Sequence, residues 1–145
     1  VRLDERLEPA GIAVGLDLTD RLTQGELRAD QLPWTKGKCF RSSAVIGGWS
    51  AWNGTWEDLV DPRIGLHLSL SVNDVLRQST PLYEMSVTPR QQIASLEAWA
   101  PVEGGDTLFT GTPEGVGQLF QGDRVLARLT NATGVVLSEI DIACA

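Results

Sequence analysis

Apolar and polar residues alternate with a period of two along much of this chain, and that pattern predicts β-strands. The clearest case is residues 66–72, LHLSLSV, in which leucine or valine at every second position defines one face and histidine and serine define the other. The Asn-Asp pair that follows suits a tight turn into a second strand over residues 75–78. Residues 123–130 and 135–143, DRVLARLT and VVLSEIDIA, flank the turn-forming NATG and predict an antiparallel pair that closes the chain.

Weaker signals predict strands in three other places. Residues 11–20, GIAVGLDLTD, alternate over a shorter stretch and predict a half-buried strand that ends between Asp17 and Thr19. Residues 44–62 hold three of the five tryptophans among glycines, and they predict a strand and a long covering loop whose tryptophans are core and interface bulk. The short run TLF, residues 107–109, predicts a strand that leads into a Gly-rich turn.

Helical spacing is limited to two segments. Thr88 can cap a helix that begins at Pro89, with Gln91 reaching back as the partner of a capping box. Ile93, Leu96 and either Trp99 or Ala100 follow at helical spacing. Residues 21–32, RLTQGELRADQL, predict a shorter helix that is broken at Pro33. The elements together predict a mainly β fold with minor α, an α+β class.

Composition narrows the class of protein. The chain has 145 residues, of which 42% are hydrophobic and 21% charged, so we expect one soluble domain over residues 1–145. The formal charge of −7 argues against nucleic-acid and anionic-membrane partners, and no apolar run is long enough for a membrane span. Cys39 and Cys144 lack metal-type spacing, so free thiols in a cytoplasmic protein are favoured over a disulfide. The chain begins with Val1 and enters a strand-like segment at once, which suggests the back part of a longer polypeptide.

A carboxylate at the end of the first long strand is the first candidate for chemistry. Asp17 is followed by Arg21 and Gln24, which one helical turn would align on a common face. An acceptor, a guanidinium and an amide in one cleft could bind a cation together with a carboxylate. Spacing alone leaves open the alternative of a solvated Asp–Arg pair.

Two loops offer further candidates. Residues 110–117, TGTPEGVG, present backbone N–H groups and threonine hydroxyls, and serve either as an anion cradle or as an ordinary β-turn loop. Residues 33–40, PWTKGKCF, surround two lysines with bulky apolar groups, which is unusual for a solvated loop. The only histidine, His67, falls on the polar face of its strand and is assigned to the surface.

Taken together, these stretches resemble the fumarylacetoacetate hydrolase family. GLDLTDRLTQ, PWTKGKCF, LSLSVNDVLRQ and LFTGTPEGVG followed by GD occur in the order and approximate spacing of that family's second half. The resemblance covers residues 11–125 and is closest to the acylpyruvase and fumarylpyruvate hydrolase branch. It implies a rolled mixed β-sheet and a homodimer.

The resemblance also implies a site and a reaction. Members bind a divalent cation, with Mg²⁺ expected first and Mn²⁺ or Ca²⁺ as alternatives, and act on small oxo acids. The implied reaction is hydrolysis of a C–C bond of an acylpyruvate to pyruvate and a carboxylic acid. Oxaloacetate tautomerisation or decarboxylation on the same fold, and a non-catalytic binding module, remain open. The implied residues are Asp17 as metal ligand, Lys38 as the catalytic ammonium, and Arg21, Gln24, Ser42, Gly111 and Thr112 as substrate-binding positions.

The chain departs from the family pattern at three positions. Leu22 stands where an aspartate commonly follows the arginine, Arg41 stands where an acidic residue is common, and Leu82 interrupts a stretch rich in threonine and serine. The family's other metal ligands, a Glu-x-Glu pair, and its His/Glu dyad are expected in a front half that this sequence does not contain. Asp17 alone does not hold a divalent ion tightly, because such sites need several oxygen ligands.

Overall fold

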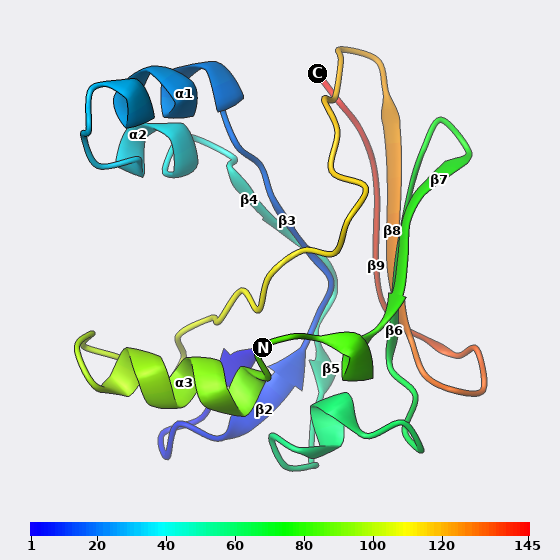
Figure 1. The fold of residues 1–145 in the computed structure, drawn as a ribbon. Helices are drawn as coiled ribbons and strands as arrows, with labels where there is room; N and C mark the ends of the chain where they lie inside the picture. Colours follow the sequence, from blue (N-terminus) through cyan, green and yellow to red (C-terminus); the bar gives the residue numbers. More distant parts are fainter. The chain divides into compact units, whose positions relative to one another are not determined.

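The computed structural model describes residues 1–145, which form two compact units (Figure 1). The larger unit combines Val1–Val14 with Gly47–Ala145, and the smaller unit is Gly15–Ile46. The chain as a whole is built mainly from strands with few helices, so the predicted fold class is confirmed. The strand pairs are all antiparallel, so the parallel pairing of a mixed sheet does not occur in these residues.

A four-stranded sheet is the main element of the larger unit. Its strands are β6 (His67–Val72), β7 (Val75–Pro81), β8 (Arg124–Thr130) and β9 (Val136–Ala143), in the order β7-β6-β8-β9. The alternation predicted these strands correctly. The register places Leu70 opposite Ala127, which in turn lies opposite Ile140, so one face of the sheet is apolar.

The turn between β6 and β7 is as tight as the Asn-Asp pair predicted. Asn73 and Asp74 have φ of 50° and 63°, the left-handed values that a two-residue hairpin turn requires. The Asn73 amide donates to Asp123 Oδ1 at 2.7 Å, and its oxygen accepts from the Arg124 backbone N–H at 2.9 Å. The hairpin is therefore tied to the start of β8. The pKa of Asp123 lies below its usual range, first because its carboxylate accepts from the Phe120 backbone N–H and second because it accepts from the Asn73 amide.

A second, smaller sheet and the only long helix of this unit complete its core. The sheet contains β1 (Arg2–Leu3), β2 (Pro9–Ile12) and β5 (Ser50–Ala51), in the order β1-β2-β5. Helix α3 (Pro89–Glu97) begins with the predicted capping box, since the Thr88 side chain and the Gln91 side chain each accept from the other's backbone N–H. The short 3₁₀ helices are η1 (Asp58–Val60) and η2 (Leu82–Glu84). The most deeply buried apolar side chains of this unit include Trp56, Leu59, Leu66, Ile93, Val125 and Ala127.

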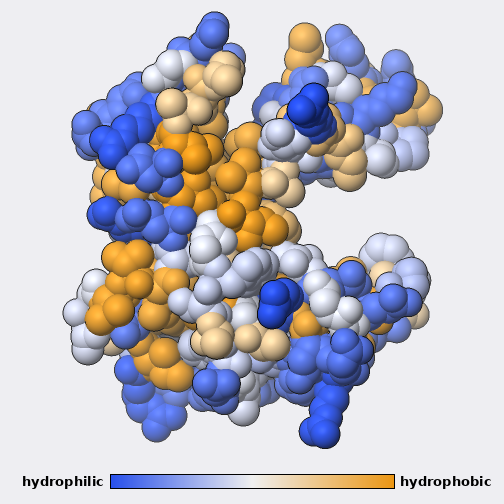
Figure 2. Space-filling model, turned by 180° about the vertical axis from the view of Figure 1, so that it is seen from behind, coloured by the Kyte–Doolittle hydropathy of each residue, from blue (hydrophilic) through white to orange (hydrophobic).

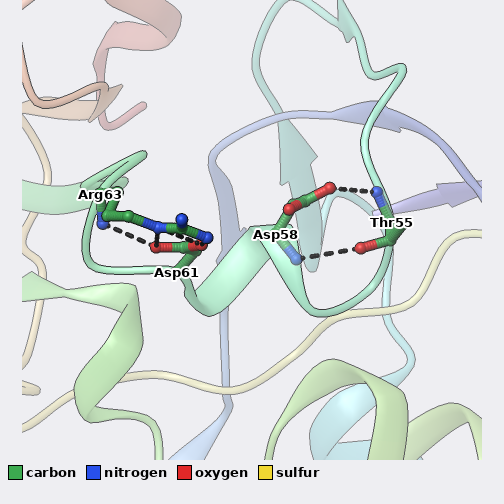
Figure 3. Close-up of polar contacts among 4 residues, drawn as sticks. All are labelled: Thr55, Asp58, Asp61 and Arg63. Atoms are coloured by element: carbon green, nitrogen blue, oxygen red, sulfur yellow. Dashed lines mark hydrogen bonds and ion pairs between the residues drawn. The ribbon is translucent and has the colours of Figure 1, made fainter.

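Short-range polar contacts fix the loop around η1 (Figure 3). Asp58 accepts from the Thr55 backbone N–H at 2.7 Å, and its own N–H donates to the Thr55 hydroxyl at 3.3 Å. Immediately after η1, Asp61 accepts from the Arg63 guanidinium at 3.0 Å through Nε, and this pair lowers the pKa of Asp61 to about 2. The long covering loop predicted here is thus ordered by its own side chains.

Two strands and two helices make up the smaller unit. Strand β3 (Gly15–Asp17) pairs with β4 (Ala44–Ile46), and α1 (Arg21–Ala29) and α2 (Thr35–Lys38) lie between them in the sequence. None of the side chains of α1 is buried. No helix in the structure has the length and apolar character that a bilayer span needs.

The two chain segments that leave for the smaller unit are held together within the larger one. The Gly47 backbone N–H donates to the Val14 carbonyl at 2.9 Å. The buried Ser138 hydroxyl accepts from the Val14 N–H at 3.1 Å and donates to the Gly48 carbonyl at 2.6 Å. Glycine is needed at 47, because a Cβ there would lie 2.6 Å from the Glu139 carbonyl oxygen.

Two predictions about strands differ from the structure. The strand over residues 11–20 is split between β2 and β3. TLF is not a strand, since Thr107 forms only an isolated bridge to Arg2, whose own strand is two residues long.

Trp99 also differs from its predicted place, because α3 ends at Glu97 and leaves this side chain 76% exposed. The tryptophans are not uniformly core residues, although Trp56 is only 1% exposed. Apolar surface is visible on the face shown in Figure 2. The exposed large apolar side chains include Leu22, Trp34, Leu76, Trp99 and Phe120. Both cysteines are free, as expected.

Candidate functional site

The smaller unit brings Asp17 and Lys38 into direct contact. Asp17 is the last residue of β3, and Lys38 is the last residue of α2. The Lys38 Nζ donates to Asp17 Oδ2 at 2.6 Å, although the two residues are 21 positions apart in the sequence. The side chains are 34% and 52% exposed respectively, so the pair is partly solvated and open to a ligand. Lys36, two residues earlier, is exposed and makes no ion pair.

Thr19 completes this cluster. Its hydroxyl accepts from Lys38 Nζ at 2.9 Å and donates to the Asp17 carbonyl at 3.3 Å. Two of the three ammonium protons of Lys38 are therefore directed at Asp17 and Thr19, and the third is free for a further acceptor. Thr19 was not predicted as a site residue, and the signal for it in the sequence is its position two residues after the candidate carboxylate.

A close contact between α1 and α2 positions the lysine. The Asp20 N–H donates to the Gly37 carbonyl at 3.0 Å, and a Cβ at Gly37 would lie 3.0 Å from Gln24 Cβ. Asp20 also caps α1 by accepting from the Thr23 backbone N–H at 3.0 Å and from its hydroxyl at 2.7 Å. These bonds, the hydroxyl first, hold the pKa of Asp20 below its usual range. The lysine is thus placed by a capped helix and a glycine that lets a second helix approach it.

Arg21 and Gln24 lie on one face of α1, as their spacing predicted. The Arg21 guanidinium donates to Gln24 Oε1 at 3.0 Å. The ion pair of Asp17 is made with Lys38, so the alternative of a solvated pair between Asp17 and Arg21 does not occur. Arg21 keeps most of its five donors for a ligand.

Ser42 lies in the exposed loop that connects α2 to β4. Its φ of 63° falls in the left-handed region, and the next residue, Ser43, donates its N–H to the Phe40 carbonyl at 3.1 Å. The structure therefore places Ser42 in a tight turn of the smaller unit, and its substrate-binding role stays a prediction.

Gly111 and Thr112 belong to the larger unit, in a loop that lies against β7. Gly111 has φ of 112°, which favours glycine, and Thr112 is exposed. The Thr112 hydroxyl accepts a hydrogen bond from the side-chain amide of Gln78 at 3.0 Å. Gln78 is 8% exposed and was not predicted as a site residue. The signal that marks it is a polar residue at a register position opposite Leu70, on the apolar face of the sheet.

The chain offers the type of ligand atom that a hard divalent cation prefers, but too few ligand side chains to hold one. Asp17 offers carboxylate oxygens, of which Oδ2 is bonded to Lys38, and such oxygens are the ligands that Mg²⁺, Mn²⁺ and Ca²⁺ prefer. The structure contains no group of three or more His, Cys, Asp or Glu side chains that could hold a metal. Asp17 therefore fits as one ligand of such a site and not as a site by itself.

Comparison with known proteins finds one family. The model of the C-terminal region of fumarylacetoacetate (FAA) hydrolase matches residues 10–140. An oxaloacetate tautomerase of Escherichia coli K12 is 37% identical over 116 residues, which are 80% of this chain and 51% of that relative. A fumarylpyruvate hydrolase of a Ralstonia species is 30% identical over 128 residues, 88% of this chain and 64% of that relative. The chain thus spans about half the length of the first of these curated relatives.

A solved structure supports the same grouping. Fumarylpyruvate hydrolase from Pseudomonas aeruginosa, in complex with Mn²⁺ and pyruvate, superposes with a TM-score of 0.74 at 31% sequence identity. The superposition covers 93% of this chain and 55% of the other.

Proposed function

Because this chain belongs to the fumarylacetoacetate hydrolase family, we propose that the protein acts on short 2-oxo acids and hydrolyses a C–C bond of acylpyruvates. The products are pyruvate and a carboxylic acid. The observation that carries the proposal is the Lys38 ammonium held 2.6 Å from the Asp17 carboxylate and 2.9 Å from the Thr19 hydroxyl. A positive charge held beside the Asp17 carboxylate suits a reaction in which negative charge develops on an oxygen of the substrate.

Each residue of the cluster has a definable task. Asp17 would contribute one oxygen ligand to a divalent cation, and the relative bound to Mn²⁺ and pyruvate supports a cation of this kind. Such a cation, when bound, polarises the 2-oxo group and stabilises the enolate of pyruvate. Lys38 would hold its ammonium toward the developing negative charge, with Thr19 fixing its direction.

Arg21 would bind the substrate carboxylate. A guanidinium presents a planar fork of donors, and only one donor atom of Arg21 is bonded to Gln24 in this structure. In this assignment Gln24 orients the Arg21 guanidinium by accepting a hydrogen bond from it.

Tautomerisation of oxaloacetate is the second candidate. It is favoured by the identity of 37% to an oxaloacetate tautomerase, which exceeds the 30% identity to a fumarylpyruvate hydrolase. Both reactions pass through the enolate of a 2-oxo acid, so the Asp17–Lys38–Thr19 cluster suits either. The two reactions differ in their substrates, because an acylpyruvate carries the acyl group that hydrolysis releases, whereas oxaloacetate is only tautomerised.

The test is product analysis with the protein incubated with Mn²⁺ or Mg²⁺. Acylpyruvates and enol-oxaloacetate are supplied separately, and pyruvate, carboxylic acid and keto-oxaloacetate are quantified by NMR. Asp17→Asn is expected to abolish turnover, since it removes the charge that would hold the cation. The matched control is Asp74→Asn in the β6–β7 turn, where asparagine also tolerates positive φ.

Pyruvate release supports hydrolysis, and interconversion without release supports the tautomerase. Full turnover in Asp17→Asn with the cation present would reject the assigned role of Asp17. Absence of turnover and of Mn²⁺-dependent oxalate binding in the unmodified protein would favour the non-catalytic binding module.

A further inference from the structure

The loop between β5 and η1 contains the only Asn-Gly pair of the chain, Asn53 and Gly54. Asn53 is exposed, and neither its side chain nor the Gly54 N–H makes a hydrogen bond within the chain. The residue that follows is held, since the Thr55 N–H donates to Asp58 at 2.7 Å (Figure 3). The Asn-Gly pair is therefore free of hydrogen bonds although it borders an ordered turn.

The chain has two other asparagines, and the first of them is held at both ends of its side chain. The Asn73 amide nitrogen donates to Asp123 Oδ1 at 2.7 Å, and its oxygen accepts from the Arg124 N–H at 2.9 Å. Rotation of this side chain requires both hydrogen bonds to open. The residue that follows is Asp74, which carries a Cβ.

The second is held together with the residue that follows it. Asn131 Oδ1 accepts from the N–H groups of Thr133 and Val135, at 3.1 Å and 3.0 Å respectively. The N–H of Ala132 is itself bonded to the Ile64 carbonyl at 3.1 Å. Both groups that could react with each other at this position are therefore engaged elsewhere.

Two conditions decide whether an asparagine side chain reacts with the main chain that follows it. The next nitrogen must approach the asparagine Cγ, and a glycine there has no Cβ that hinders the approach. The side chain and that nitrogen must also be free to move, which hydrogen bonds to either group prevent. Asn53 meets both conditions, whereas Asn73 and Asn131 meet neither.

We infer that Asn53 is a site of spontaneous deamidation. The Gly54 nitrogen, after losing its proton to hydroxide, attacks Asn53 Cγ, and the new C–N bond closes a succinimide ring. The bond from Cγ to the side-chain nitrogen breaks, and ammonia leaves with a proton taken from water. Water then adds to one of the two ring carbonyls and gives aspartate or isoaspartate. Water is the only co-reactant, and nothing is oxidised or reduced.

The products change the loop around η1. Asp58 Oδ2 lies only 3.0 Å from the place that a Cβ of Gly54 would occupy, so the new carboxylate adds a negative charge beside an existing one. Isoaspartate also lengthens the main chain by one methylene group. The hydrogen bonds between Thr55 and Asp58 and the buried side chains of Trp56 and Leu59 follow directly in the sequence. Both products therefore loosen this loop, and isoaspartate does so more than aspartate.

The experiment incubates the folded protein, and the same protein in guanidinium chloride, at alkaline pH and follows each asparagine by peptide mass spectrometry. Folded Asn53 should react within about threefold of its rate in denaturant, because local opening there costs almost no free energy. Folding should slow Asn73 and Asn131 by roughly tenfold or more, since their hydrogen bonds must open first. Isoaspartate should accompany aspartate at position 53, because direct hydrolysis of the amide gives aspartate alone.

Asn53→Gln is the matched variant, because its longer side chain closes the corresponding ring much more slowly. It should remove the methyl groups that an isoaspartyl methyltransferase transfers from labelled S-adenosylmethionine to the aged protein. Folding that protects Asn53 as strongly as Asn73 and Asn131 would overturn the inference. Aspartate without isoaspartate at this position would overturn it too, since the succinimide would not have formed.

Hydrogen exchange of residues 55–59 tests the effect on the loop. Exchange should be faster in Asn53→Asp than in the unmodified protein and faster still in the aged protein that carries isoaspartate. The Asn53→Gln protein, aged in the same way, should exchange as the fresh protein does. Equal exchange in all of these samples would overturn the assigned effect on the loop around η1.

Discussion

The polar cluster of the smaller unit is made of charges, whereas the cluster around Gln78 in the larger unit is made of neutral amides and hydroxyls. Asp17 and Lys38 are 52% and 34% exposed, and water can reach both. Gln78 is almost fully buried, and its donors end on one loop. The charged cluster would act on a ligand through its electric field, whereas the neutral cluster fixes the position of a loop through its hydrogen bonds.

The difference decides which substitution is informative in each region. A half-exposed charge can be removed with little effect on folding, because partly solvated ion pairs contribute little to stability. A buried network tolerates neither an unpaired polar group nor added volume. Charge-deleting variants therefore probe the smaller unit, and steric variants probe the larger one.

The largest expected effect is on Lys38. Lys38→Met should lower kcat by about 10²–10³, the usual cost of removing one preorganised donor to a developing negative charge. Lys36→Met, in the same helix and exposed, should leave kcat unchanged. Steady-state kinetics with the best oxo-acid substrate makes the comparison, and thermal unfolding checks that both variants fold.

Equal losses in the two lysine variants would mean that general positive charge matters rather than the contact with Asp17. In that case the smaller unit would have no site of its own, and the contrast with the larger unit would disappear.

Gly115→Ala should give the next largest effect, this time on stability. The new Cβ overlaps the Arg77 carbonyl oxygen, and alanine is strained at φ of 93°, so the free energy of unfolding should fall by about 2 kcal/mol. Gly117→Ala is the control, because no atom lies within 4 Å of its added Cβ and its φ is not in the left-handed region. Urea unfolding compares the two, and a Gly115→Ala protein as stable as the control would show that the loop is not seated on β7.

The smallest expected effect is on acid stability. The pKa values of Asp20, Asp123 and Asp141 lie below the ordinary 3.8, through hydrogen bonds from Thr23, from the Phe120 N–H and from Arg124 respectively. The pKa of Asp61 is lowered to about 2 by Arg63. Depressed carboxyl pKa values contribute stability that is present above 3.8 and lost as the pH falls through the folded values.

Unfolding midpoints should therefore be nearly constant between pH 7 and pH 5 and should fall as the pH decreases from about 3.8 to about 2. Asp141→Asn should flatten part of that fall, since it removes one of these titrations. An unchanged acid profile in this variant would show that the contact with Arg124 contributes nothing.

Local signals predicted much of this fold. The capping box at Thr88, the hairpin turn at Asn73 and the period-two strands each depend on neighbouring residues, so the sequence displays them directly. Only the resemblance assigned Asp17 and Lys38 to one site, and no local pattern pairs them, because 21 residues separate the two. The roles of the substrate-binding residues stay predictions.

The rest depends on long-range pairing. In the sequence, Gln78 is one of several polar residues in a strand and nothing distinguishes it. Only the strand register places it opposite Leu70 and against the loop at 112–114. TLF has the residues of a strand but lacks a partner of sufficient length. Trp99 continues a helical spacing that its helix, which ends at Glu97, does not reach.

The hydrogen bond between Gly47 and Val14 has a consequence for how this protein can change over time. Residues 15–46 begin and end next to Val14 and Gly47, whose main chains are hydrogen-bonded to each other within the larger unit. The Ser138 hydroxyl adds a second link between the two segments. Replacing that whole segment by another of different length costs little closure entropy, because its anchor points do not move. Such an arrangement lets evolution, or a protein engineer, graft new chemistry at 15–46 onto an unaltered sheet.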